Sequence, residues 1–121
     1  MLKEEQMGSN DISIEQEKAE DVVVLTVGGF VDSSTFEQLE NCIFDSFRKG
    51  SYKILINLAQ VQYLSSAGAG VFLNARGEAQ ENNGNVVLLS PSEPVRDVFE
   101  LLGLTRVMLM TESREGALAT F

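Results

Sequence analysis

Short apolar runs and amphipathic helical patterns alternate along most of this 121-residue chain, and this alternation limits the possible folds more than any other feature. The apolar runs at 52–58 and 85–90 are short and rich in β-branched or branched residues, which is typical of buried strands. Helical patterns precede, separate and follow them. Because parallel neighbouring strands need crossover connections, single strands between helices predict a mostly parallel α/β sheet.

The chain ahead of this alternating part predicts an antiparallel hairpin. A short strand around 12–16 and a second strand at 22–27 flank a polar turn at 18–21. Gly28 and Gly29 either end the second strand or bulge it. The hairpin adds an antiparallel edge to the predicted sheet.

Apolar residues at helical spacing predict about four helices and a last strand. The helices are expected within 33–50, 65–84, 91–103 and 112–121, and the strand at 106–110. Ser34 and Glu37 fit a capping box at the start of the first helix. The order β-β-α-β-α-β-α-β-α predicts a single α/β domain over 11–121, which follows a flexible lead-in at 1–10.

Composition argues against several classes of function. A net charge of −9 disfavours nucleic acid and anionic lipid as partners, and no apolar run approaches the roughly 20 residues of a membrane span. Histidine is absent, which removes the usual general base and the commonest zinc ligand. With Cys42 as the single cysteine, no intrachain disulfide can form. We therefore expect a cytoplasmic protein that is not an enzyme, holds no metal and does not insert into a membrane.

The stretch YLSSAGAGVF, residues 63–72, places two serines where a buried strand ends and a helix begins. The carboxyl ends of parallel strands are where such sheets carry their sites. One interpretation is structural: Ser65 or Ser66 caps the helix, while Gly68 and Gly70 allow close packing.

Two other interpretations give this junction a function. The free N–H groups at the helix start could bind a phosphate ligand, although no G-x-G-x-x-G pattern is present. Alternatively, one serine is itself phosphorylated. The helix dipole tolerates a phosphoserine there, and nearly two added negative charges would release a partner docked on an uncharged loop.

Other residues favour simpler roles. Asp32 follows the second strand and is interpreted as a helix cap near the site. Phe30 either belongs to an apolar docking patch or points into the core. Cys42 is expected to be a buried, inert thiol, and Met108 and Met110 to fill the core.

These motifs resemble the STAS domain, in the form found in bacterial anti-sigma factor antagonists, over about 11–121. The family's Gly-Glu-Leu/Ile-Asp corresponds to 29–32, and its signature Asp-Ser-Ser/Thr/Ala-Gly-Leu-Gly to 65–70. The strand ILINLAQVQYL, the turn before a buried strand (NNGNVVLL) and the helix ending in Gly-Leu (VFELLGLTRV) complete the similarity.

The resemblance implies a regulatory domain that binds a partner and performs no chemistry. In the family, an anti-sigma factor that is also a serine kinase phosphorylates the serine after the signature Asp, which here is Ser66. The unphosphorylated form binds the kinase and frees the sigma factor, and a phosphatase resets the phosphorylated form. The implied partner surface is Phe30, Asp32, Ser65, Ser66, Ala67, Gly68 and Ala69. Because the nucleotide would come with the kinase, we expect no bound cofactor.

Three positions depart from the family pattern. Ser65 replaces the signature Asp, Phe30 replaces the earlier Glu, and Ala69 replaces the Leu between the glycines and offers a smaller contact surface. The adjacent serines leave Ser65 open as a second phosphorylation position. An alternative function is a non-phosphorylated STAS accessory subunit of a transporter or signalling complex. A hydrolase built on Ser66 would lack a histidine base.

Overall fold

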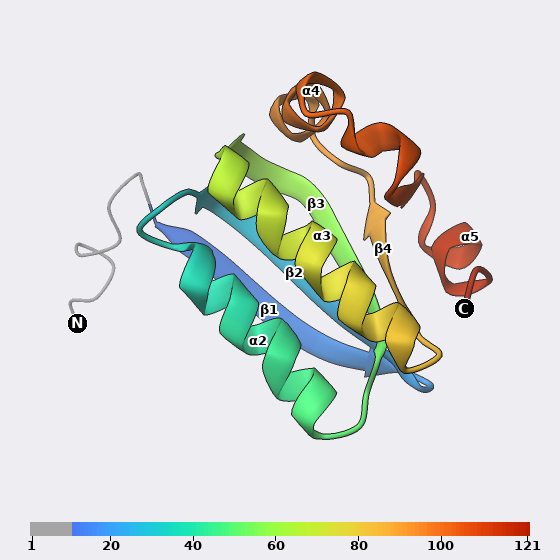
Figure 1. Ribbon diagram of the computed structural model, residues 1–121. Helices are drawn as coiled ribbons and strands as arrows, with labels where there is room; N and C mark the ends of the chain where they lie inside the picture. Colours follow the sequence, from blue (N-terminus) through green and yellow to red (C-terminus); the bar gives the residue numbers. More distant parts are fainter. Residues whose placement is uncertain (1–10) are drawn as a thin grey trace.

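The computed structural model describes residues 11–121, so the lead-in expected at 1–10 lies outside the described residues. Its centre is one sheet in which the strands follow chain order. The strands are β1 (Ile12–Ala19), β2 (Val22–Val31), β3 (Lys53–Leu64), β4 (Asn85–Leu89) and β5 (Leu109–Thr111). β1 is antiparallel to β2 and the other neighbours are parallel, which confirms the predicted arrangement (Figure 1).

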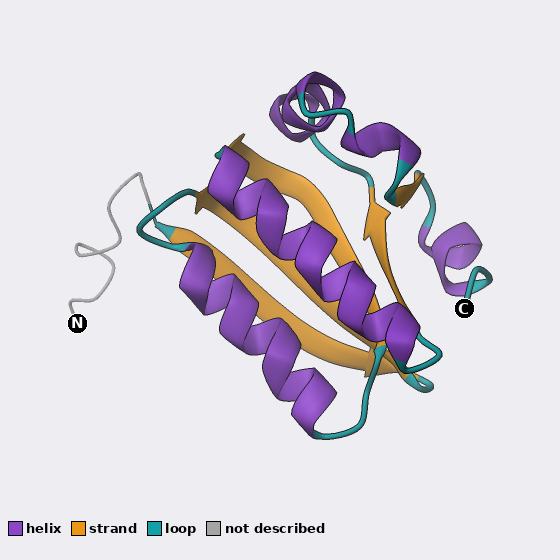
Figure 2. Ribbon diagram, in the orientation of Figure 1, coloured by secondary structure: helices purple, strands orange, loops and turns teal. Residues whose placement is uncertain are grey.

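Helices connect the parallel strands, as the alternating sequence pattern predicts. They are α2 (Phe36–Arg48), α3 (Ser66–Glu81), α4 (Glu93–Leu101) and α5 (Arg114–Leu118), with a 3-10 turn, η1 (Leu104–Arg106), before β5. α2 and α3 lie side by side across one face of the sheet, whereas α4 and α5 lie toward the β4–β5 edge (Figure 1, Figure 2). Within residues 11–121, no helix is both long and apolar enough to cross a membrane.

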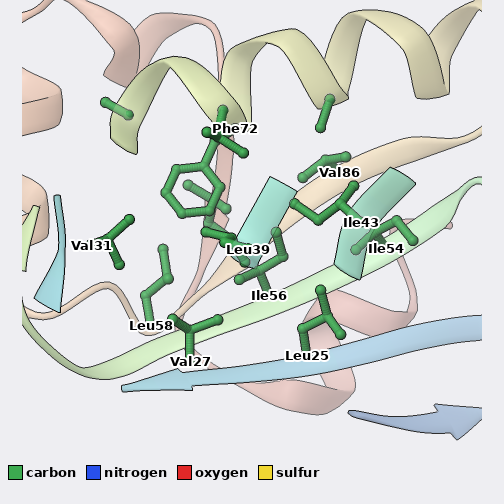
Figure 3. Packing of buried hydrophobic residues seen from close by; sticks show 14 of the residues in the cluster. Leu25, Val27, Val31, Leu39, Ile43, Ile54, Ile56, Leu58, Phe72 and Val86 are labelled. Atoms are coloured by element: carbon green, nitrogen blue, oxygen red, sulfur yellow. The ribbon is translucent and has the colours of Figure 1, made fainter. Parts of the chain in front are cut away.

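The apolar side chains form two clusters because alternate residues of a strand point to opposite faces. In β3, Ile54 and Ile56 belong to the larger cluster, whereas Leu55 belongs to a smaller cluster on the other face together with side chains of α5. Figure 3 shows the larger cluster, to which α2 contributes Leu39 and α3 contributes Phe72. The main core therefore lies between the sheet and the pair α2 and α3.

The hairpin turn is tighter than the sequence predicts. β1 pairs with β2 as far as Ala19 opposite Val22, which leaves only Glu20 and Asp21 in the turn. Glu20 has a φ of 58°, as two-residue hairpin turns require. The prediction that the turn starts at Lys18 is wrong because Lys18 lies on an exposed edge strand, where a polar residue does not signal a turn.

β2 passes through its glycine pair and ends at Val31. Gly29 has a φ of 87°, and a Cβ atom there would lie 2.3 Å from the carbonyl oxygen of Asp11, so the position requires glycine. The register between β2 and β3 shifts on both sides of the glycine pair, between Thr26 and Gly28 and again between Gly29 and Phe30. The bulge is therefore confirmed, and the predicted strand end at Val27 is wrong.

β3 extends six residues beyond the end of the apolar run that predicted it. The run ends at Leu58, after which only Val61 and Leu64 are buried. The backbone nevertheless keeps pairing with β2, and Tyr63 lies opposite Phe30. A pattern of apolar residues cannot reveal this extension because most of its side chains are exposed.

The predicted capping box of α2 is wrong. Thr35 is the N-cap residue, but its side chain makes no cap hydrogen bond. The Ser34 hydroxyl donates instead to the carboxylate of Asp32, at 2.8 Å. The Ser34 hydroxyl is therefore used in a local turn with Asp32 and does not form the predicted capping box with Glu37.

The last strand lies further along the chain than predicted. The first residue of the expected strand, Arg106, is the last residue of η1, and β5 is only Leu109–Thr111. Met108 is buried and Met110 packs against the larger cluster, which confirms their expected role as core or near-core side chains.

Candidate functional site

The strands β2 and β3 end at the same edge of the sheet. They are parallel and pair through their last residues, Val31 and Leu64. The backbone N–H of Ser65 donates to the Val31 carbonyl at 2.9 Å, so the chain entering α3 lies beside the chain leaving β2. This junction is the place where the sequence predicts a site.

Ser65 is the N-cap of α3. Its φ of −88° and ψ of 168° are extended, and its Oγ accepts the backbone N–H of Gly68 at 3.1 Å. Its carbonyl accepts the first helical N–H, from Ala69, at 2.9 Å. The capping interpretation is confirmed for Ser65, which satisfies one of the unpaired donors at the start of the helix.

Ser66 has a different environment. It is the first residue of α3 and is exposed. Among the described residues, its hydroxyl makes no hydrogen bond, in contrast to the hydroxyl of Ser65. The first turn of α3 contains no acidic residue, and no charged residue precedes Arg76 in the helix. Ser66 therefore presents a free hydroxyl on an uncharged helix start.

The two signature glycines differ in what surrounds them. A Cβ atom at Gly68 would lie 2.8 Å from Cγ1 of Val31 and 2.9 Å from Cδ1 of Leu64, so only glycine allows α3 to start this close to the strand ends. Around Gly70, apart from its chain neighbours and the nearby backbone of α3, no described atom lies within 4 Å of the corresponding position, so the expected close packing is wrong there.

The first turn of α3 has an exposed side and a buried side. Ala67 is exposed, whereas Gly68 is buried and Ala69 is fully buried. The expectation that Ala69 contributes contact surface is therefore corrected: its methyl group belongs to the larger apolar cluster. Gly68 and Ala69 therefore help to position the start of α3 and are not themselves accessible to a partner.

The interpretation of Asp32 as a helix cap is wrong, because Thr35 is the N-cap of α2 and Asp32 instead organises the loop that leads from β2 into the helix. Its Oδ1 accepts the backbone N–H and the hydroxyl of Ser34, at 2.9 and 2.8 Å. These hydrogen bonds, the Ser34 hydroxyl first, hold the pKa of Asp32 below its ordinary value. The hydroxyl of Thr35, which is buried, donates to the carbonyl of Phe30 at 2.7 Å. An ionised carboxylate thus lies in the loop beside the α3 junction.

Phe30 pairs with an aromatic residue that the sequence prediction of the site missed. Its ring centroid lies 6.0 Å from that of Tyr63, at an interplanar angle of 32°. Phe30 is half-buried and is not part of either core cluster, whereas Tyr63 is 47% exposed. The sequence does show an aromatic residue, Tyr63, just before the serine pair. Because the strand was predicted to end at Leu58, the sequence could not place Tyr63 opposite Phe30 on β2.

Cys42 lies outside the junction, on α2. It is half-buried rather than buried as predicted, because its side of α2 lies at the margin of the core. Desolvation and, secondarily, the Asp45 carboxylate raise the pKa of the Cys42 thiol. Across residues 11–121, no three His, Cys, Asp or Glu side chains gather as metal ligands would.

The fold and this junction define a class of small mixed α/β domain whose candidate site lies where two parallel strands end. The family model of the STAS domain matches residues 13–117. The chain belongs to the STAS domain family.

Individual relatives agree with this assignment. The anti-sigma-B factor antagonist of Staphylococcus epidermidis is 30% identical over 105 residues, which cover 87% of this chain and 97% of the relative. The anti-sigma factor antagonist SpoIIAA in its unphosphorylated form matches with a TM-score of 0.77 and 28% identity, covering 89% of this chain and 95% of that one. The phosphorylated form of SpoIIAA from Bacillus matches with a TM-score of 0.70 and 27% identity, covering 89% and 98%.

Proposed function

We propose that this protein is an anti-sigma factor antagonist, a cytoplasmic binding module that is switched by phosphorylation of Ser66. The observation that carries the proposal is the free, exposed hydroxyl of Ser66 at the start of α3. Similarity to proteins named anti-sigma factor antagonists supports the class of partner, and the phosphorylated form of SpoIIAA supports the kind of switch. The unphosphorylated form would bind the anti-sigma factor.

This chain would be the substrate of the phosphoryl transfer. The anti-sigma factor, acting as a serine kinase, would supply ATP, whose γ-phosphoryl group moves to Oγ of Ser66 while the hydroxyl proton leaves and ADP is released. A phosphatase would add water across the new P–O bond and return the hydroxyl and inorganic phosphate. We propose no catalytic role for any residue of this chain.

The geometry favours Ser66 over Ser65. Phosphorylation of Ser65 would place a bulky dianion on the oxygen that accepts the N–H of Gly68, in a half-buried position against Val31. Within residues 11–121, the Ser66 hydroxyl makes no hydrogen bond that a phosphate would break, and the phosphate would gain from the free N–H groups and the dipole of α3.

The surface around Ser66 suits a partner that binds without having to desolvate charged side chains. Ser66, Gly70 and Leu73 recur at helical spacing along α3, and Leu73 is 37% exposed. Ala67, the next residue of α3, and Tyr63, near the end of β3 and three residues before Ser66, are also exposed. We call these five residues the α3 face. It is uncharged although the chain carries a net charge of −9.

A phosphate on Ser66 would change the charge of the α3 face. It would place nearly two negative charges at one end of an uncharged contact surface. A docked partner would then have to desolvate that charge or move away. Asp32, in the neighbouring loop, supplies a carboxylate at the same edge of the sheet, where the signature Asp is replaced by Ser65.

Intact-mass spectrometry on the protein isolated from its own cells, followed by site mapping, tests the proposal. We expect one added phosphate on Ser66, which Ser66→Ala abolishes. Ser65→Ala serves as the matched control: it removes the helix cap, at a cost of about 1 kcal/mol of stability, but keeps the phosphate.

Two results would contradict the proposal. A phosphate that maps to Ser65 would show that the cap hydrogen bond does not protect that serine. An unmodified protein, still held in a stable complex under several growth and stress conditions, would indicate a constitutive docking module. Such a protein would fit the alternative of an accessory subunit in a transporter or signalling complex.

A further inference from the structure

Lysine side chains gather at the end of the sheet opposite Ser66. Lys18 of β1, Lys49 at the end of α2 and Lys53 at the start of β3 line one open cavity of about 390 Å³. They are all the lysines within residues 11–121. The 12-residue strand β3 separates this cavity from the α3 junction by about 40 Å. We define the lysine cleft as Lys18, Asp21, Lys49, Lys53, Asn82 and Asn83.

The lining of the lysine cleft is positively charged. Among residues 11–121, Asp21 is the only carboxylate that lines it, and Oδ2 of Asp21 lies 2.8 Å from Nζ of Lys53. Among the described residues, Lys18 and Lys49 have no carboxylate oxygen within 4.0 Å of their ammonium groups. Three ammonium groups and one carboxylate leave a local charge of +2 in a chain whose net charge is −9.

The negative ends of nearby helix dipoles offset only part of the positive charge of these lysines. α2 and α3 both end beside the cleft, and Lys49, the C-cap residue of α2, stabilises the negative end of that helix. Two helix ends carry about half a negative charge each, so the cleft stays positive. Lys18 comes from β1 and caps no helix, and Asp21 is already paired with Lys53.

Neutral donors complete the lining. Among the described residues, neither the carboxamide of Asn83 nor the hydroxyl of Ser51, which also borders the cavity, makes a side-chain hydrogen bond. Ammonium groups from three different elements, together with neutral donors, suit a ligand with several anionic oxygens rather than a single carboxylate. A volume of about 390 Å³ is enough for a small molecule.

We propose that the lysine cleft binds a small anion that carries phosphate groups. Lys18 and Lys49 would contact its oxygens directly, and Lys53 would be held in place by Asp21. Binding would join β1 to the ends of α2 and α3 through the ligand and relieve the repulsion between the ammonium groups. The site is distinct from the α3 junction and does not depend on phosphorylation of Ser66.

A titration of the full chain with inorganic pyrophosphate, followed by amide NMR at constant ionic strength, tests this site. We expect saturable shifts of the backbone amides of Gly50, Ser51, Asn82 and Asn83. Lys18→Gln and Lys49→Gln should each weaken binding by about tenfold. Arg106→Gln is the matched control, because Arg106 is an exposed cation of η1 that does not line the cleft, so its loss should leave the affinity unchanged.

Several outcomes would overturn the inference. Shifts that do not saturate would exclude a site, as would an equal loss of affinity in Arg106→Gln. Shifts confined to Ser66 and its neighbours would show that the start of α3, not the lysine cleft, binds the anion. Ser66→Ala should bind pyrophosphate as the unaltered chain does, and a loss of affinity in this variant would place the anion at the start of α3. The phosphorylation of Ser66 is tested separately, by mass spectrometry.

Discussion

Ser65 and Ser66 are neighbours of the same residue type, but their hydroxyl groups have different roles. Ser65 is the N-cap residue of α3, whereas Ser66 is the first residue of the helix. The extended conformation of Ser65 turns its Oγ toward the N–H of Gly68. Ser66 already has helical geometry and exposes its hydroxyl to solvent. A single residue therefore separates a structural hydroxyl from an available one. Asp32 is the third polar group of this edge, and its carboxylate is committed to its own loop.

The hydrogen bonds of Asp32 predict a pH-dependent contribution to stability. Because the pKa of Asp32 is lower in the folded protein than its ordinary value of 3.8, the ionised carboxylate stabilises the fold above that value. This stabilisation is lost as the pH falls through the folded pKa. In urea unfolding, we expect Asp32→Asn to be less stable than the unaltered chain at pH 7.

The difference between the two proteins should shrink as the pH falls below 3.8. Asn keeps an acceptor oxygen for Ser34, so the comparison isolates the charge. A difference that stays constant over this range would show that the loop needs only the shape of the side chain.

α3 differs from the other long helices because its position depends on packing more than on helix propensity. It contains three glycines and has no acidic residue in its first turn, whereas α2 and α4 each have one there. Glycines lower helix propensity, so burial of side chains such as Phe72 and Ala75 must hold the helix against the sheet. The same composition leaves the α3 face uncharged.

The two signature glycines of α3 predict opposite effects of one substitution. Gly68→Ala should destabilise the protein by about 1–3 kcal/mol, because its Cβ would overlap Val31 and Leu64. Gly70→Ala should stabilise it by about 0.5–1 kcal/mol, because the added methyl group meets only solvent and helix propensity rises. Urea unfolding of both variants measures the two changes. Equal effects of the same sign would contradict the tight packing at Gly68.

Charge is distributed unevenly over the whole molecule. One end has the uncharged α3 face, the other has the lysine cleft, and the net charge is nevertheless −9. The ion pairs within residues 11–121, such as Lys53 with Asp21 and Arg114 with Glu17, are solvent-exposed. Exposed pairs contribute little to stability, so repulsion among the excess acidic groups is the larger electrostatic effect.

This balance predicts that added salt stabilises the protein. At about 0.1 M salt the Debye length is about 10 Å, which screens repulsion between distant carboxylates. At neutral pH, the free energy of unfolding should therefore rise with NaCl, measured by urea unfolding. The effect should vanish near the isoelectric point. A decrease with salt at neutral pH would show that the exposed ion pairs outweigh the repulsion.

The order of elements could be predicted from the sequence because each depends on local periodicity. The alternation of strands and helices predicted the parallel sheet, and the serine pair at a strand end predicted the place of the site. One prediction failed because distant residues decide: β3 continues past Leu58 because β2 pairs with it. Another failed because two local hydrogen-bonding patterns compete, and the Ser34 hydroxyl donates to Asp32 rather than joining a capping box.

The sequence by itself determined the class of fold and the serine pair, since periodicity and residue type are local properties. Only the tertiary structure distinguished Ser66 from Ser65, assigned Ala69 to the core and paired Phe30 with Tyr63. It also brought Lys18, Lys49 and Lys53 from three elements to one cavity. The physical reason is that burial, strand register and the proximity of charges depend on residues far apart in the chain, which no local pattern encodes.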